Sequence, residues 1–252
     1  MFNASSPVSV SVSGVVHFLG ACIVVLLGAS VLSTVLHSFG VRPNAHALLF
    51  VDAEANLPTY YSALQLLAAG VLLAVIALME RRKESPFCLQ WLVLSLGFIL
   101  MSVDETCSLH EKLIAPVRSL LGGRELGVFY FAWVIPALIF VGFAGVYFWK
   151  FLWHLPPISR RDFVVAAALF LGGAIGMEML GGQADEAHGR HGAYLLWTHL
   201  EEGLEMFGIL YFIRALLHHL TAMDGRFAVV LAADDATSPA PIRPPGTLVS
   251  SQ

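Results

Sequence analysis

Residues 60–79 read YYSALQLLAAGVLLAVIALM, twenty residues without one charged side chain. A run of this length is enough to cross the roughly 30 Å hydrocarbon core of a bilayer as an α-helix. The next five residues, 80–84, read ERRKE and form a basic connector. The two stretches together predict a membrane-spanning helix that ends at a charged membrane surface.

Five further apolar runs of similar length lie on either side, at residues 15–37, 87–103, 127–153, 163–182 and 194–217. All six are expected to be helices, because an open sheet cannot satisfy its backbone hydrogen bonds in lipid. We therefore predict an all-α polytopic membrane protein, a bundle of six transmembrane helices within residues 1–220. Residues 221–252 contain four prolines and only a short apolar stretch, so they are predicted to form a flexible cytoplasmic tail.

The composition of the whole chain agrees with a membrane protein. Of 252 residues, 57% are hydrophobic and 13% are charged, with a formal net charge of −4. This excludes disordered, collagen-like, coiled-coil and nucleic-acid-binding chains, which carry more charge and less aliphatic surface. The three cysteines are an odd number, and Cys88 and Cys107 are 19 residues apart on one expected helix, so a disulfide framework is not expected.

Basic residues predict the orientation of the bundle. The connector at 80–84 and Arg160-Arg161 lie after the second and fourth runs, and the positive-inside rule places both in the cytoplasm. Both termini are then cytoplasmic. We expect a multi-pass protein of the bacterial inner membrane whose outer half carries twelve of the eighteen acidic residues and six of the ten histidines.

The most informative polar stretch is THLEEGLE at residues 198–205, at the outer end of the sixth run. One face of this helix carries His199, Glu201, Glu202 and Glu205 within an arc of about 160°. The apolar remainder, residues 206–217, is too short to span a membrane alone. Several of these charges must therefore lie at membrane depth and face a protein interior, unless the helix simply begins outside the membrane with solvated acids.

Other runs supply partners for this face. Asp104, Glu105 and His110 lie at the outer end of the third run, where the alternative is that they mark the helix leaving the membrane. Glu178 follows the glycine-rich residues 172–176, whose small side chains allow a neighbouring helix to approach closely. A lone acid near a helix end could instead extend to the interface.

These side chains together form a candidate metal site. The predicted ligands are Asp104, Glu105, His110, Glu178, His199, Glu201, Glu202 and Glu205. Mixed carboxylate and imidazole ligands suit a divalent Zn, Mn or Fe ion, and an all-oxygen site prefers Mg or Ca. The spacing matches no established metal motif. Crowded carboxylates can also relay protons, and residues 52–56 are a candidate lid.

Three classes of function fit this pattern. The first is a membrane protein that binds or conducts a divalent cation or protons through an outward-facing site. The second is a metal-dependent membrane hydrolase acting on lipid, in which a glutamate is the general base. The third is a structural or assembly subunit whose polar face docks a second copy or a partner membrane protein. The sequence does not decide whether the protein is an enzyme.

Two resemblances bear on these classes. Ser102, Asp104, His110 and His199 are loosely similar to residues of the seven-span hydrolase superfamily of alkaline ceramidases and progestin and adiponectin receptors. The chain departs from that pattern in having six runs and no His-x-x-x-His in its last helix. Residues 52–59, residues 102–105 with 110–111, and residues 200–206 resemble a group of bacterial multi-span membrane proteins of unknown function, over most of residues 15–217. This second resemblance implies a bacterial inner membrane and no particular activity.

Overall fold

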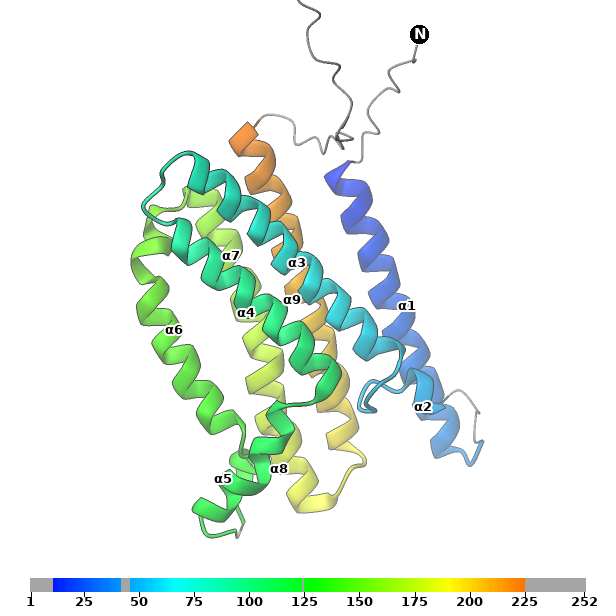
Figure 1. Ribbon diagram of the computed structural model, residues 1–252. Coiled ribbons are helices and arrows are strands. Elements are labelled where there is room, and N and C mark those ends of the chain that lie inside the picture. The colour runs from blue at the N-terminus through cyan, green and yellow to red at the C-terminus, as the bar shows by residue number, and fades with distance from the viewer. Residues whose placement is uncertain (1–10, 42–45, 124, 225–252) are drawn as a thin grey trace, which may run out of the picture.

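The computed structural model of the protein describes residues 11–41, 46–123 and 125–224. In this part of the chain, six helices are long and apolar enough to cross a membrane, which confirms the predicted all-α fold and its six spans. Their order can be followed by colour in Figure 1. They are α1 (Val12–Ser38), α3 (Leu57–Arg82), α4 (Cys88–Cys107), α6 (Val134–His154), the continuous fifth span made of α7 (Pro157–Leu171), η3 (Gly172–Met177) and α8 (Glu178–His188), and α9 (Ala193–Asp224).

Short helical segments connect the spans, namely α2 (His46–Leu49), η1 (His110–Leu113), α5 (Ile114–Leu120) and η2 (Gly127–Phe129). The fourth span is predicted to begin at residue 127, but α6 begins at Val134. Gly127 has a φ of +55°, which an α-helix does not accept, and its N–H donates to Glu186 at 2.6 Å. At the other end of the bundle, α9 continues to Asp224, and the predicted tail lies outside the described residues from residue 225 onward.

The basic connectors share one end of the bundle. The first turn of α1 and the last turn of α9 lie at the top of Figure 1, together with the α3–α4 and α6–α7 connections. Arg81 and Arg82 are the last two residues of α3, and Arg160 lies in the first turn of α7. The bundle therefore has a basic end. The acidic stretch at residues 198–205 lies near the start of α9, toward the opposite end. Placement of the basic end in the cytoplasm stays a prediction.

The apolar core lies in the half of the bundle near the basic end. Its buried members come from every long helix except α1, and include Leu73, Trp91, Phe151, Phe163 and Leu216. Two hydrogen bonds between serine hydroxyls and backbone carbonyls, each 2.8 Å long, tie α4 to α3 at Ser95 and Ser102. The buried apolar side chains are therefore concentrated in this half of the bundle. The cavity described below lies mainly in the opposite half.

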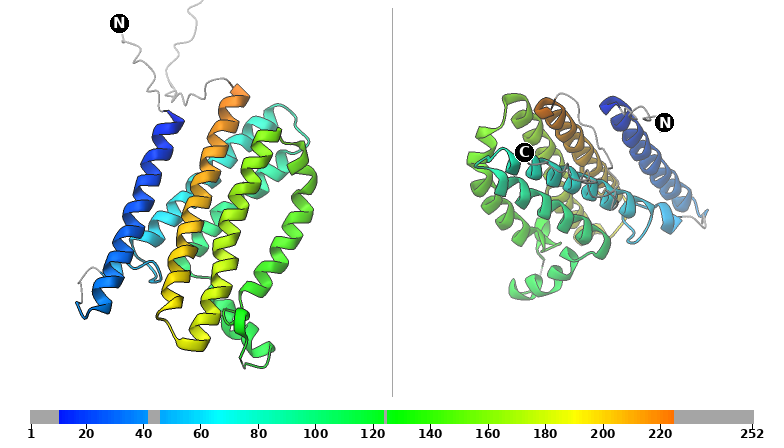
Figure 2. Two further views of the ribbon diagram at one scale, coloured as in Figure 1. Left: turned by 180° about the vertical axis from the view of Figure 1, so that it is seen from behind. Right: turned by 45° about the horizontal axis from the view of Figure 1, so that its top comes forward.

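Helices α7 and α9 approach each other very closely. A Cβ atom added at Gly173 would lie 2.7 Å from the carbonyl oxygen of Glu201, and one at Gly208 would lie 2.7 Å from the backbone nitrogen of Phe170. Figure 2 shows the fifth span and α9 side by side along their length. The small residues in the fifth span thus do what the sequence predicts, because they let one backbone touch another.

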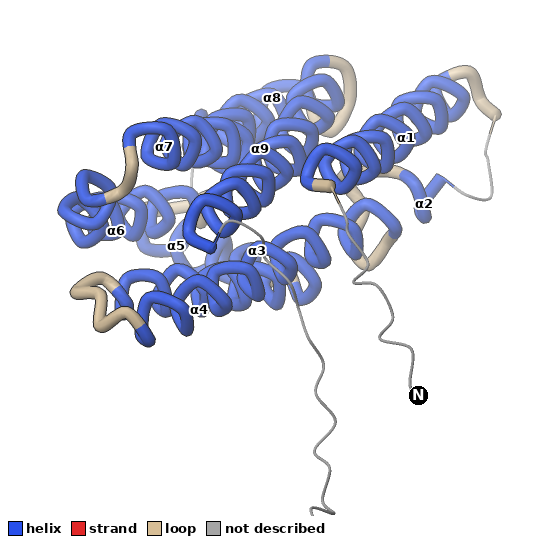
Figure 3. Tube along the Cα trace, turned by 90° about the horizontal axis from the view of Figure 1, so that it is seen from above, coloured by secondary structure: helices blue, strands red, loops and turns tan. Residues whose placement is uncertain are grey.

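Two helices are attached more loosely. Figure 3 shows α1 at one side of the bundle, against α9. Helix α6 has 21 residues, of which only Val134 at its beginning and Phe151 near its end are buried. The middle of α6 therefore stands away from the apolar core, and this position determines the shape of the cavity described next.

Candidate functional site

A cavity of about 700 Å³ lies between α4, α6, the fifth span, α9 and the loop before α3. Its wall carries nine carboxyl groups, against one guanidinium, Arg190, and one imidazole, His110, among the lining residues that the structure describes. The carboxyl groups come from five different elements or loops. They are Asp52, Glu54, Asp104, Glu105, Glu111, Glu178, Glu201, Glu202 and Glu205.

Seven of the eight predicted site residues line this cavity. The exception is His199, which faces α1 instead. Its Nε2 lies 3.0 Å from the hydroxyl of Ser30, and its Nδ1 lies 2.7 Å from the carbonyl oxygen of Leu195. The arc of α9 that carries His199 and the glutamates meets two different surroundings. His199, at its edge, contacts α1, and the glutamates face the cavity.

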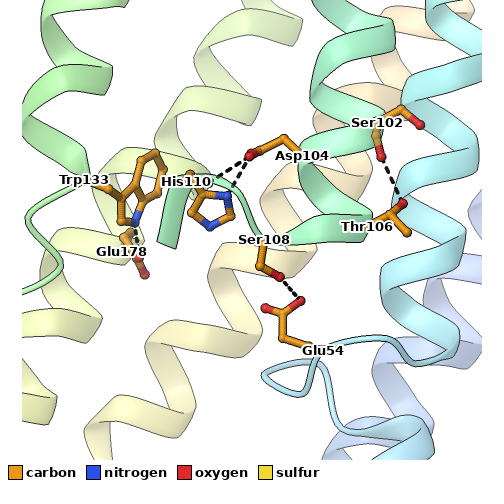
Figure 4. A network of polar contacts seen from close by, with 8 residues as sticks. All are labelled: Glu54, Ser102, Asp104, Thr106, Ser108, His110, Trp133 and Glu178. Carbon is orange, nitrogen blue, oxygen red and sulfur yellow. Dashed lines mark hydrogen bonds and ion pairs between the residues drawn. The ribbon is translucent and has the colours of Figure 1, made fainter. Parts of the chain in front are cut away.

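Two of the carboxyl groups, Asp104 and Glu178, are joined by one linked set of side chains, and a third, Glu54, accepts a hydrogen bond from the hydroxyl of Ser108 (Figure 4). Asp104 accepts a hydrogen bond from the backbone N–H of His110 at 2.9 Å and lies 2.8 Å from its Nδ1. The imidazole packs against the indole of Trp133, with ring centroids 4.6 Å apart. The indole N–H in turn donates to Glu178 at 2.7 Å. Asp104 and Glu178 are thus held in place by a linked set of side chains.

The charge of His110 depends on this arrangement. Burial opposes protonation of the ring, but the hydrogen bond and the negative charge of Asp104 outweigh burial, and Glu111 and Glu178 add to their effect. The pKa of His110 is therefore raised above its ordinary value. The imidazolium form fits a hydrogen bond donated to a carboxylate.

Three other carboxyl groups have no such partner. Glu105, Glu202 and Glu205 form no hydrogen bond or ion pair with any residue of the described chain. The charged neighbours of Glu202 and Glu205 are other carboxyl groups, whereas Glu105 lies near His110 as well as near Glu54 and Asp104. The carboxyl of Glu201 lies beside that of Glu178. Adjacent carboxylates repel one another unless a proton or another cation lies between them. The centre of the site is therefore short of positive charge.

The fifth span changes geometry where it meets these glutamates. Residues 172–177 form a π-helical segment directly before Glu178. Such segments are rare and frequently occur at functional sites. Within it, Gly173 contacts the backbone of α9 at Glu201 and Glu205. Sequence reasoning identified the glycines and Glu178, but a π-helical turn has no sequence signature that could have been used.

The wall of the cavity at the end away from the basic end includes two residues that the sequence did not single out, Arg190 and Tyr194. The hydroxyl of Tyr194 donates to Asp52 at 2.5 Å, and Arg190 lies 3.6 Å from Asp52 and 3.3 Å from Asp185. Burial raises the pKa of Asp52 despite the opposing effects of Tyr194 and Arg190. Asn56 caps α3 by accepting from the backbone N–H of Thr59. The predicted lid therefore forms part of the wall, and its movement stays a prediction.

The predicted metal ligands do not converge on one point. Among the residues described by the structure, no three His, Cys, Asp or Glu side chains converge at metal-ligand distance. The imidazole of His110 is engaged with Asp104, and that of His199 lies against α1. The side chains left over are oxygen donors, which fit Mg, Ca or Mn better than Zn. A Zn, Mn or Fe cofactor stays a prediction.

Comparison with known proteins adds one finding. The family model of a domain of unknown function, DUF8692, matches residues 16–220 of the chain, from the second turn of the first span to the last turn of the sixth, and this range includes every residue that lines the cavity. No curated protein and no solved structure matches the chain.

Proposed function

The chain belongs to the family of the domain of unknown function DUF8692, and we propose that it binds a cation in its acidic cavity, within the depth of the membrane. The observation that carries the proposal is the charge of the cavity wall. Nine carboxyl groups face one guanidinium and one imidazole, and Glu105, Glu202 and Glu205 have no partner among the described residues.

The free-energy cost of placing ionised carboxyl groups at membrane depth supports a bound cation. An ionised side chain at the centre of a membrane helix costs about 2.5–3.5 kcal/mol on insertion scales, so three unpaired glutamates would cost on the order of 9 kcal/mol. A cation that occupies the cavity removes much of this cost. Protonation of the carboxyl groups removes it as well, so protons compete with the cation for the same site.

The contact between Glu178 and Glu201 favours exchange of the cation for protons. Two adjacent carboxyl groups share a proton readily, and both line the same cavity as Glu205. Intramembrane acids of this kind mark ion pathways and proton relays in transporters. We propose that cation binding releases protons from this group, and that the cavity opens to the outer side of a bacterial inner membrane.

The other two classes have less support. A lipid hydrolase that activates water needs a metal held by several ligands, and the described side chains do not converge in that way. A structural subunit that docks a partner through its acidic face needs that face on the outside. The carboxyl groups instead line a cavity between the helices.

Isothermal titration calorimetry of the purified protein in nanodiscs tests the proposal, with Mn²⁺, Ca²⁺ and octylammonium as probe cations. At least one probe should bind, with weaker binding at lower pH. The double variant Glu202→Gln/Glu205→Gln should lose about tenfold or more in affinity, or about 1.4 kcal/mol. The control is Glu84→Gln, because Glu84 is exposed near the basic end. Absence of binding by all three probes, or equal binding by both variants, would reject the proposal.

A further inference from the structure

The cavity is much larger than the space that a bare ion needs. Its volume of about 700 Å³ falls within the roughly 300–1,000 Å³ range of small-molecule sites. The carboxyl groups are spread around its wall, and in the described ranges no three potential ligands converge on one point. Volume and ligand spacing therefore favour an organic cation over a single metal ion.

Along two helices the apolar lining residues lie deeper in the bundle than the carboxyl groups. On α4, Met101 precedes Asp104 and Glu105, and on the fifth span Phe170 precedes Glu178 by two helical turns. In both helices the apolar lining residue lies nearer to the apolar core and the carboxyl group lies nearer to the outer loops.

Helix α6 adds no carboxyl group to the wall. Trp133, at its N-cap, contacts Glu178, and the apolar lining residues Ala137, Phe140 and Val141 follow toward the basic end. A ligand that matches this wall has a positive head and an apolar body. Its head would lie near the outer loops and its body near the middle of the bilayer.

The apolar end of the cavity borders the surface that faces lipid. Helix α6 is buried only at Val134 and Phe151, so its middle is not packed against another helix. Phe140 lines the cavity and is nevertheless 72% exposed. One layer of side chains on α6 therefore separates the apolar end of the cavity from the bilayer. Figure 1 shows α6 at the outer edge of the bundle, apart from α4 over much of its length.

We infer that the cation is an amphipathic amine that reaches the cavity from the bilayer. Its ammonium group lies among Glu105, Glu202 and Glu205, and its apolar chain lies against Ala137 and Phe140 of α6. This inference rests on the proposed function, since it names the class of cation that the acidic cavity binds. An ammonium group needs no fixed coordination geometry, so carboxyl groups spread around a cavity can hold it.

Calorimetry with a series of ligands in nanodiscs tests this inference, with empty nanodiscs as the reference. The series is methylammonium, butylammonium and octylammonium, with octanol as the uncharged molecule of equal chain length. Each methylene that the cavity buries should tighten binding about fourfold, so octylammonium should bind at least about 100-fold more tightly than methylammonium. Octanol should show no binding beyond that to empty nanodiscs, because it lacks the charge.

Two variants of α6 locate the chain of the amine. Ala137→Phe fills the apolar end of the cavity and should reduce the affinity for octylammonium to that for butylammonium. Ile139→Phe places the same ring on the opposite face of α6, at a residue that is 57% exposed and does not line the cavity, so it should bind like the parent protein. Equal affinities of the two variants would overturn the placement of the apolar chain.

The remaining outcomes separate this inference from the proposed function. If Mn²⁺ or Ca²⁺ binds in a manner that needs Glu202 and Glu205, while the amines do not bind or bind without regard to chain length, the amine is wrong and the acidic cation site stands. If octanol binds as tightly as octylammonium, the charge of the ligand is irrelevant and the inference is overturned. If neither metal ions nor amines bind, both are overturned.

Discussion

Substitution of Gly173 by alanine should loosen the contact between the fifth span and α9 at the site itself. A Cβ atom there would lie 2.7 Å from the carbonyl oxygen of Glu201 and 3.1 Å from the backbone nitrogen of Glu205. Ordinary contact begins at 3.4 Å, so the two backbones must separate by about 0.7 Å. A side-chain rotation could relieve only the third contact, 3.0 Å from the Cγ atom of Glu205, because the other two obstructing atoms belong to the backbone.

The expected cost of Gly173→Ala is about 1–3 kcal/mol in the free energy of unfolding, the usual range for overpacking. Two alanine variants of the same π-helical segment are controls, because a Cβ atom at Gly172 or Gly176 meets nothing within 4 Å. These should leave the protein unchanged, or stabilise it by up to about 1 kcal/mol through helix propensity. Reversible unfolding in mixed micelles, followed by circular dichroism, measures all three. Similar losses for all three variants, or no loss for Gly173→Ala, would refute the close approach.

Three further predictions concern polar contacts. The raised pKa of His110 means that its ion pair with Asp104 stabilises the protein fully below the ordinary histidine pKa, and that this stability is lost as the pH rises through the higher folded-state value. Unfolding measured between about pH 5 and 9 should show this loss in the parent protein, and its persistence in Asp104→Asn would contradict it. Trp133→Phe removes the donor to Glu178 and should lower the free energy of unfolding by about 1–3 kcal/mol, so an unchanged unfolding midpoint would count against that contact. Ser95→Ala removes one interhelical hydrogen bond and should cost about 0.6–1.7 kcal/mol in the same assay, whereas a gain in stability would show that the bond is not made.

The six spans could be predicted from the sequence because each depends on a local property, the length of an uncharged run. The boundary at the fourth span was less predictable. Residues 127–133 are as apolar as the helix that follows, but the backbone at Gly127 and the hydrogen bonds to Glu186 separate them from α6. Glu186 is 59 residues away from Gly127, so this boundary depends on a contact that local patterns do not contain.

The acidic site was predictable from the free-energy cost of charges that face lipid and from the helical repeat of the glutamates. Glutamates at the start of a span with too few apolar residues must face protein, and the cavity lined by Glu201, Glu202 and Glu205 agrees with that argument. Periodicity alone placed His199 with them, because it gives the angle of a side chain around one helix and not the neighbour that each angle meets. The contributions of Arg190 and Tyr194 were missed for a similar reason, since both contact a loop 138 or more residues earlier in the chain.

The end of α4 has an electrostatic consequence of its own. The helix ends at Cys107, where Ser108 adopts a left-handed conformation with a φ of +47°, so Asp104 and Glu105 occupy its last turn. The unpaired carbonyl groups at a helix C-terminus act like about half a negative elementary charge, and acids are usually disfavoured beside them. The backbone itself therefore adds negative potential to the cavity. A homologue that replaced Glu105 with an amide would still prefer a positive occupant, because part of that preference is encoded in where the helix stops.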